Sequence, residues 1–140
     1  MGLKDTVKTA LTVAQATGGI YTLEDTGRSG INRTRVPAAF GDAGIIKPCI
    51  LIKERATFDT ADLVGNITSA RTTLEVWFYD HDSYLVIDAM RESVYGQLQN
   101  ARLDGTFELI WNWDVREGHD ESIDACTERS DFWVYLVKGS

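Results

Sequence analysis

The centre of the chain carries the stretch TTLEVWFYDHDSYLVIDAMRESVYGQL, residues 72–98, in which the hydrophobic period changes halfway along. Residues 72–79 alternate between two faces, which predicts a strand. One face holds Thr72, Leu74, Val76 and Phe78, and the other holds Thr73, Glu75, Trp77 and Tyr79. From Tyr84 to Leu98 the spacing of the apolar residues becomes helical, with Ile87, Met90, Val94 and Leu98 as the main stripe and Tyr84, Leu85 and Val86 widening it. Asp82 or Ser83 can cap this helix.

Three further strands are predicted around this stretch. Residues 47–53 form a continuous apolar run that begins beside Pro48, which is typical of a central strand buried on both faces. Residues 107–114 alternate, and so do residues 132–137. The first of these has Phe107, Leu109, Trp111 and Trp113 against Glu108, Ile110, Asn112 and Asp114; the second has Phe132, Val134 and Leu136 against Trp133, Tyr135 and Val137.

The N-terminal part of the chain combines a helix with long irregular segments. Residues 3–17 carry a narrow apolar stripe formed by Leu3, Val7, Ala10, Leu11 and Ala14, which predicts a helix ended by Gly18 and Gly19. Residues 20–23 favour a short strand. Residues 24–46 and 55–71 show no period. We expect a loop at 24–46 that is mobile in the free chain and orders on assembly, and a loop or a strand-extension hairpin at 55–71.

These elements together predict the α+β class: a mainly antiparallel sheet of about four or more strands with two helices packed on one face. The 140 residues fit a single domain, residues 1–140. With 44% hydrophobic and 25% charged residues the composition is that of a globular protein, which excludes a disordered tail. A net charge of −7 argues against a surface that binds duplex DNA.

The predicted sheet leaves an aromatic face that two helices cannot cover. Period-two alternation puts Trp77, Tyr79, Trp133 and Tyr135 on that face. Aromatic side chains with a polar rim are enriched at protein interfaces, so we expect this face to meet another subunit. The rim would consist of Glu75, Glu108 and Asp114, paired with Arg28, Arg33 or Arg35 of the neighbour, which form the one local basic cluster. The alternative is that the long loops fold over this face.

Residues with catalytic or metal-binding potential are sparse. No nucleotide-binding, hydrolase-elbow or zinc-protease motif occurs. His81 and His119 each lie beside acidic residues, but neighbours on one loop rarely converge on one ion, so we interpret both as solvated turns and expect no metal, no cofactor and no catalytic residue. Cys49 and Cys126 are expected to stay reduced. The acidic stretch 114–131 is interpreted as a solvated hairpin loop, or else as a negative wall facing another chain or a channel.

The order of elements resembles the tail-terminator (tail-completion) proteins of long-tailed bacteriophages. The likeness lies in the N-terminal helix, the step Gly19-Ile20-Tyr21, the strand 48–52 after a long loop, the strand 71–78, the helix segment 94–98 and the final strand 130–137. It is a likeness of arrangement that covers nearly the whole chain, and no single motif in it is specific.

The resemblance implies a structural virion protein without enzymatic activity. Such a protein forms a homo-oligomeric ring, most often a hexamer, in the tail-neck region of a virion assembled in the host cytoplasm. The ring caps the tail tube protein, ends polymerisation and offers a docking surface to the head connector or neck protein, while DNA passes through without specific binding. Two alternatives stay open: another ring component of the phage neck or head-completion apparatus, and a soluble monomeric α+β module that binds a ligand.

Overall fold

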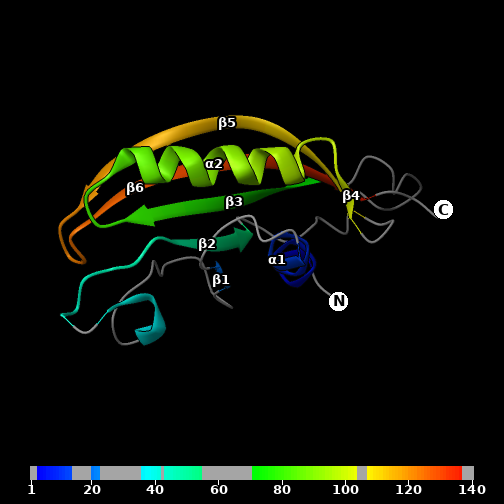
Figure 1. Ribbon diagram of the computed structural model, residues 1–140. Coiled ribbons are helices and arrows are strands. Elements are labelled where there is room, and N and C mark those ends of the chain that lie inside the picture. The colour runs from blue at the N-terminus through cyan, green and yellow to red at the C-terminus, as the bar shows by residue number, and fades with distance from the viewer. Residues whose placement is uncertain are drawn as a thin grey trace.

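One curved sheet with two helices on one side organises the structure (Figure 1). The computed structural model describes residues 3–13, 20–22, 36–41, 43–54, 71–103 and 107–136. In chain order the elements are α1 (Leu3–Val13), β1 (Ile20–Thr22), the 3₁₀ helix η1 (Pro37–Ala39), β2 (Cys49–Glu54), β3 (Arg71–Asp80), α2 (Tyr84–Leu98), β4 (Arg102–Leu103), β5 (Phe107–Asp120) and β6 (Ala125–Leu136). The sheet order is β1-β2-β3-β6-β5-β4. Among the described strands only the β1–β2 pair is parallel, so the predicted α+β class with a mainly antiparallel sheet is confirmed.

Both helices pack on the same face of the sheet, which we call the helix face; the opposite side is the reverse face. One core cluster joins Leu3, Val7 and Leu11 of α1 to the apolar stripe of α2 and to alternate residues of β2, β3, β5 and β6. The removal of these apolar side chains from water is the largest favourable contribution to the free energy of folding. The predicted helix 3–17 is confirmed as far as Val13, and residues 14–17 lie outside the described part of the chain.

Helix α2 has the bounds predicted from the sequence. Its cap is Ser83, whose Oγ accepts a hydrogen bond from the Val86 backbone N–H at 3.4 Å. Ile87, Met90, Val94 and Leu98 are buried, as expected. Leu85 does not widen the buried stripe, because it stands two residues before Ile87, about 200° around the helix axis. The Leu85 side chain is 81% exposed.

Strand β2 is central and buried on both faces, which confirms the prediction from its continuous apolar run. Ile50 and Ile52 join the core on the helix face. Cys49 and Leu51 join a second, smaller core cluster on the reverse face. Two covered faces explain why this strand shows no alternation of polar and apolar residues.

A β-bulge in β5 overturns part of the predicted alternation of residues 107–114. Trp111 pairs with Phe132, but the next registered pair is Trp113 with Asp131, so Asn112 is an extra residue in β5. Directly opposite residues share a face, and an inserted residue shifts the side chains that follow it to the other face. In β5 this holds as far as a second register shift between Arg116 and Gly118. Trp113 therefore lies on the reverse face and Asp114 on the helix face. Both face assignments made from the sequence were wrong.

The acidic stretch 114–131 is a hairpin of two long strands rather than a solvated loop. Strands β5 and β6 continue to Asp120 and from Ala125, so only the turn 121–124 interrupts them. Glu128 and Asp131 are buried, at 2% and 0% exposure. The many charged residues of this stretch favoured a solvated loop in the sequence analysis. Glu128 and Asp131 are instead buried, and arginines of the same subunit pair with them.

Part of the predicted loop 24–46 folds onto the reverse face. Val36, Ala39 and Ile46 form the second core cluster with Cys49, Leu51, Tyr79, Ile123 and Ala125. A bridge between Phe40 and Ile46 and the turn of η1 satisfy backbone groups of this segment. Residues 36–41 and 43–46 therefore pack on the sheet, and the mobility of the loop in the free chain stays a prediction. Residues 24–35 and 55–70 lie outside the described ranges.

The two cysteines are free and lie in different core clusters, Cys49 on the reverse face and Cys126 on the helix face. A disulfide between them would have to cross the sheet. Burial, reinforced by the negative charge of Asp80, raises the pKa of Cys49 to about 12. Burial and the charges of Asp80 and Asp82 also raise the pKa of Cys126.

We expect neither thiol to react with iodoacetamide at pH 8 in the folded chain, because the thiolate is the nucleophile and both thiols are buried and neutral. Mass measurement should show two added groups only after unfolding in guanidinium. The unfolded Cys49 thiol titrates near 9.0 and the folded one near 12, so its contribution to the free energy of unfolding is present below pH 9 and is lost as the pH rises toward 12. Rapid native labelling of Cys49 would contradict this description of the reverse-face core.

Candidate functional site

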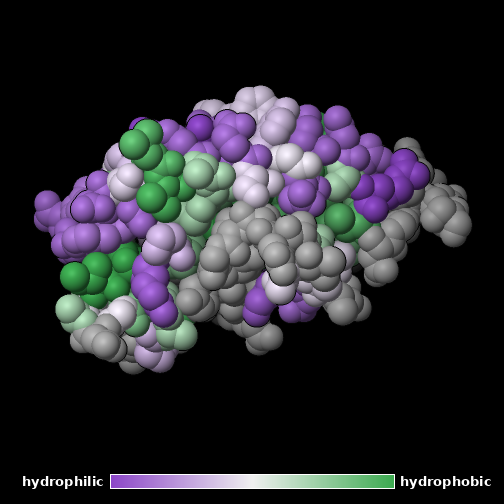
Figure 2. Space-filling model, in the orientation of Figure 1, coloured by the Kyte–Doolittle hydropathy of each residue, from purple (hydrophilic) through white to green (hydrophobic). Residues whose placement is uncertain are grey.

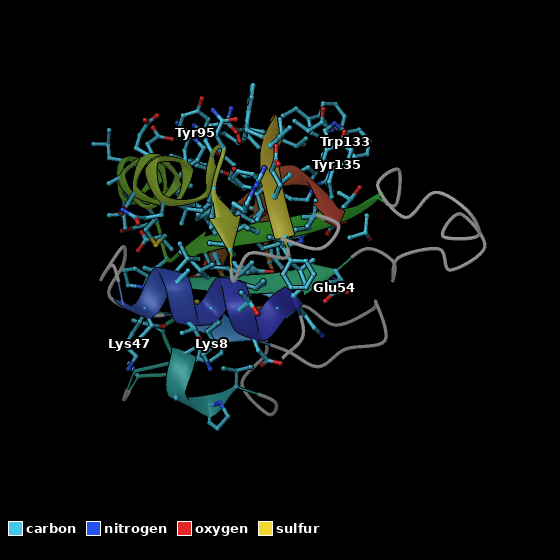
Figure 3. All side chains as sticks on the ribbon, turned by 90° about the vertical axis from the view of Figure 1, so that its right-hand side faces the viewer. Lys8, Lys47, Glu54, Tyr95, Trp133 and Tyr135 are labelled. Carbon is cyan, nitrogen blue, oxygen red and sulfur yellow. The ribbon has the colours of Figure 1, made fainter. Side chains whose placement is uncertain are left out.

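The four aromatic residues predicted to share a sheet face do so, but they differ in burial. Tyr79 is 4% exposed, and Trp77, Trp133 and Tyr135 are half-buried. Cross-strand pairing of Thr73 with Trp133 and of Trp77 with Arg129 puts β3 and β6 in register across this face. Figure 3 shows Trp133 and Tyr135 projecting together on the side of the sheet away from α2. Trp133 and Tyr135 thus lie outside the cluster of described residues that covers Tyr79.

Tyr79 is buried in the second core cluster, and the half-buried Trp77 packs against that cluster. Their rings stack at a centroid distance of 6.5 Å, and both pack with the segment that includes Val36 and Ile46. The Trp77 Nε1–H donates to Glu75 Oε1 at 2.8 Å. The Lys53 ammonium and the Arg129 guanidinium lie 5.8 and 5.5 Å from the Trp77 ring centroid. At this end of the sheet, part of the predicted loop 24–46 covers the aromatic face. This is the alternative that the sequence analysis left open.

The carboxylates predicted to form the rim already have partners in their own subunit. Glu75 accepts from Trp77, and Glu108 pairs with Arg102 at 3.1 Å. Asp114 lies on the helix face, where its Oδ1 accepts from Trp111 Nε1 at 3.0 Å and from Ser130 Oγ at 2.6 Å. Their predicted partners Arg28, Arg33 and Arg35 lie outside the described residues.

Trp113 is a candidate interface residue that sequence reasoning assigned to the wrong face. It is 51% exposed, and its Nε1–H donates to Asp131 Oδ2 at 2.5 Å. Asp131 stands opposite Glu75 in the β3–β6 ladder, and its Oδ1 lies 3.0 Å from Arg129 Nε. The nearby guanidinium and indole N–H groups offset the repulsion between two adjacent carboxylates. No local sequence signal marks the bulge that brings Trp113 to this place.

A cluster of charged side chains on the helix face ties α2 to the β5–β6 hairpin. Glu128 accepts from Arg91 Nη1 and, at 2.8 Å, from Arg116 Nε. Asp88 bonds the same two arginines at 2.8 and 2.7 Å, and the Arg116 guanidinium lies 4.0 Å from the Tyr84 ring centroid. Burial lowers the pKa of Arg91, but the bonds to Glu128 and Asp88 outweigh it and raise that pKa overall. Hydrogen bonding to Glu128 likewise raises the pKa of Arg116. These contacts stabilise the subunit.

Both histidines converge on one turn residue, although they are 38 positions apart in the sequence. His81 Nδ1 lies 3.1 Å from the Asp124 backbone oxygen, and His119 Nε2 lies 2.9 Å from Asp124 Oδ1. Within the described ranges, no three His, Cys, Asp or Glu side chains are grouped so as to hold a metal ion. Neither described helix is long and apolar enough to cross a membrane.

Comparison with known proteins gives a likeness of fold. No protein-family model and no curated protein matches the chain. Among solved structures, it is similar to a chain in the virion of a native gene transfer agent particle, with a TM-score of 0.55 and 12% sequence identity. The similarity covers 96% of this chain and 93% of that chain. At that identity the comparison establishes that the two chains share an α+β fold over almost their whole lengths.

Proposed function

We propose that this chain is a structural protein of a phage-like virion that forms a ring, caps the tail tube, ends its polymerisation and joins the tail to the head connector. The observation that carries the proposal is the fold shared end to end with a chain of a gene transfer agent virion. The order of elements, from the N-terminal helix to the final long strand, supports the tail-terminator assignment within that class.

The part of the reverse face that no described segment covers supports self-association. Among the described residues, both helices lie on the other face, and residues 36–41 and 43–46 cover the end around Tyr79. Trp113 is exposed, and Ile110, Trp133 and Tyr135 are half-buried on the same face. A large buried aromatic side chain removes about 150–250 Å² from water, so these residues would form the centre of a subunit contact. A ring built this way needs no catalytic group and no cofactor.

The negative net charge of the chain is compatible with a ring through which DNA passes. A net charge of −7 gives the assembled ring an acidic balance. Phosphate groups are repelled by such a surface, so a duplex would pass through the ring without being held.

Tail length tests the proposed capping role. Particles assembled without this chain should carry tails of uncontrolled length that lack heads, and adding the purified chain should restore a uniform length, both measured by electron microscopy. Tails of normal length without heads would instead assign the chain to another ring of the neck. Normal, infectious particles would contradict any role in the tail or neck.

We expect replacement of Trp133 and Tyr135 by Ala to dissociate the ring while leaving the subunit folded. Both side chains are half-buried in the subunit, and each central aromatic at an interface contributes on the order of 2 kcal/mol, about 30-fold in affinity. Light scattering should show a monomer, and circular dichroism should show that this monomer keeps its secondary structure and melts cooperatively.

Trp77→Ala serves as the contrasting variant. Because Trp77 is bonded to Glu75 and packed in the second core cluster, its loss should lower the melting temperature of the subunit itself. An intact ring in the Trp133→Ala, Tyr135→Ala protein would show that the uncovered end of the reverse face is not the subunit contact.

A further inference from the structure

The margin of the sheet that β5 forms is long and largely unpaired. In the strand order β1-β2-β3-β6-β5-β4, the outermost strand β4 has two residues and pairs only with Phe107 and Glu108 of β5. Among the described strands, none pairs with the outer side of β5 after Glu108. Figure 1 shows β5 and β1 at opposite margins of the sheet. An unpaired strand margin is a template for an extended segment of another chain, because its row of N–H and C=O groups needs partners.

The outer side of β5 becomes free only after Trp111. The Leu109 N–H and C=O bond the backbone just after α2, and the Trp111 N–H donates to Gln99 Oε1 at 2.6 Å. Two register shifts follow, one on either side of residues 113–116, which stay in regular register with β6. Figure 2 shows mostly hydrophilic surface along this margin. Bulges and polar side chains limit what can pair with a sheet margin, so the stretch 113–116 suits a short strand.

The opposite margin carries a strand of matching length and direction. β1 has three residues and pairs with β2 on its inner side, and no described strand lies on its outer side. β1 and β2 run parallel, and the pairs β2–β3, β3–β6 and β6–β5 are antiparallel, so β1 and β5 point in opposite directions. Rotation about an axis along the strands keeps these directions. β5 of one copy therefore meets β1 of the next as an antiparallel pair, which is the more stable kind.

We propose that residues 113–116 of β5 pair with β1 of the next copy, so that the sheet continues from one subunit to the next. This inference rests on the ring proposed above and names the backbone contact that closes it. Because the two margins differ, the contact is head to tail and closes into a ring, whereas two identical margins would give a two-fold dimer. Trp113 is exposed on the reverse face, near Trp133 and Tyr135, so the strand pairing and the aromatic contact form one continuous surface.

Cysteine cross-linking of the full-length chain tests this pairing. Tyr21 stands opposite Leu51 and Val115 opposite Arg129, which assigns both positions to the reverse face. Within one subunit β2, β3 and β6 separate them by about 19 Å, at about 4.8 Å per strand, whereas a disulfide needs Cα atoms within about 7 Å. On oxidation, the Tyr21→Cys, Val115→Cys chain should give a ladder of linked multimers up to the full ring on a non-reducing gel. A mixture of the two single variants should give linked dimers and nothing larger.

Two further measurements make the result specific. Tyr21→Cys with Ala89→Cys puts the second thiol on the exposed side of α2 and should give no ladder, and each single variant alone should stay unlinked. Hydrogen exchange followed by mass spectrometry needs no substitution. Peptides that cover residues 113–116 should exchange about tenfold more slowly in the assembled chain than in the dissociated chain, because their outer N–H groups gain partners. Peptides from β6, which is paired on both sides within the subunit, should change little.

The possible results separate the strand pairing from the ring. A ring in light scattering with no cross-link and unchanged exchange at residues 113–116 would overturn the strand pairing while the ring itself stands. Linked dimers of the Val115→Cys chain alone would mean that β5 pairs with itself across a two-fold axis, and an equal ladder from the Ala89→Cys control would mean unspecific linking; both overturn the proposal. A wild-type chain that stays monomeric at every concentration would contradict both this pairing and the self-assembled ring.

Discussion

The Val94→Asp protein should not fold. Val94 is fully buried in the middle of α2, where it packs with Leu98, Ile87 and the strands of the helix face. An aspartate at this position must either bury an unpaired charge or be protonated, and each course costs several kcal/mol. A domain of this size has a total free energy of unfolding of about 5–15 kcal/mol, so most of the native population is lost. The Met90→Asp protein should also fail to fold, because Met90 lies on the same buried stripe of α2.

Two matched variants separate the buried charge from other effects. Ala89→Asp puts the same residue on the exposed side of the same helix and should cost less than about 1 kcal/mol. Val94→Ala removes packing without adding charge and should cost about 2 kcal/mol. Circular dichroism and thermal melting measure all three. A Val94→Asp chain with the wild-type melting temperature would mean that α2 does not cover the sheet.

Replacing Glu128 by Ala should destabilise the subunit by about 1.5–3 kcal/mol, because hydrogen bonds between charged groups are lost while Arg91 and Arg116 keep Asp88 as a partner. The Glu128 side chain is 3% exposed and bonds both Arg91 and Arg116. Without it, two guanidinium groups remain beside α2 with Asp88 as their main partner. The hairpin would then separate from α2 more readily.

Glu92→Ala provides the control, because Glu92 contacts the same guanidinium from the solvent. The Glu92 Oε1 atom lies 3.8 Å from Arg91 Nη2, and its side chain is 74% exposed. An exposed ion pair contributes about 0–1 kcal/mol, so this loss should be small. Urea unfolding of the two variants gives the comparison. Equal losses for Glu128→Ala and Glu92→Ala would mean that the buried carboxylate contributes no more than a surface pair.

Local patterns were sufficient to predict the helices and most strands. α2 combines a four-residue apolar stripe with a serine cap, both of which act within one or two turns, so the sequence alone located its ends. The apolar run 48–52 within the predicted strand 47–53 indicated a strand covered on both faces, because no polar residue interrupts that run. These signals depend on residues near one another in the chain.

The candidate interaction surface was predicted only in part. Alternation placed Trp133 and Tyr135 on the reverse face, where the structure has them. It could not show that Val36, Ala39 and Ile46 return to cover Tyr79, because that contact joins segments about 40 residues apart. It also could not show that Glu75, Glu108 and Asp114 have partners within the subunit.

The sequence by itself determined the class of the fold, the stripe of α2 and the presence of an aromatic sheet face. Only the tertiary structure decided which side chains of that face reach the surface. One extra residue, Asn112, sends Trp113 to the reverse face and Asp114 to the helix face, and no local pattern marks it. The reason is physical: periodicity records which residues share a face within one element, whereas a bulge, a covering segment and a buried ion pair depend on contacts between elements distant in the chain.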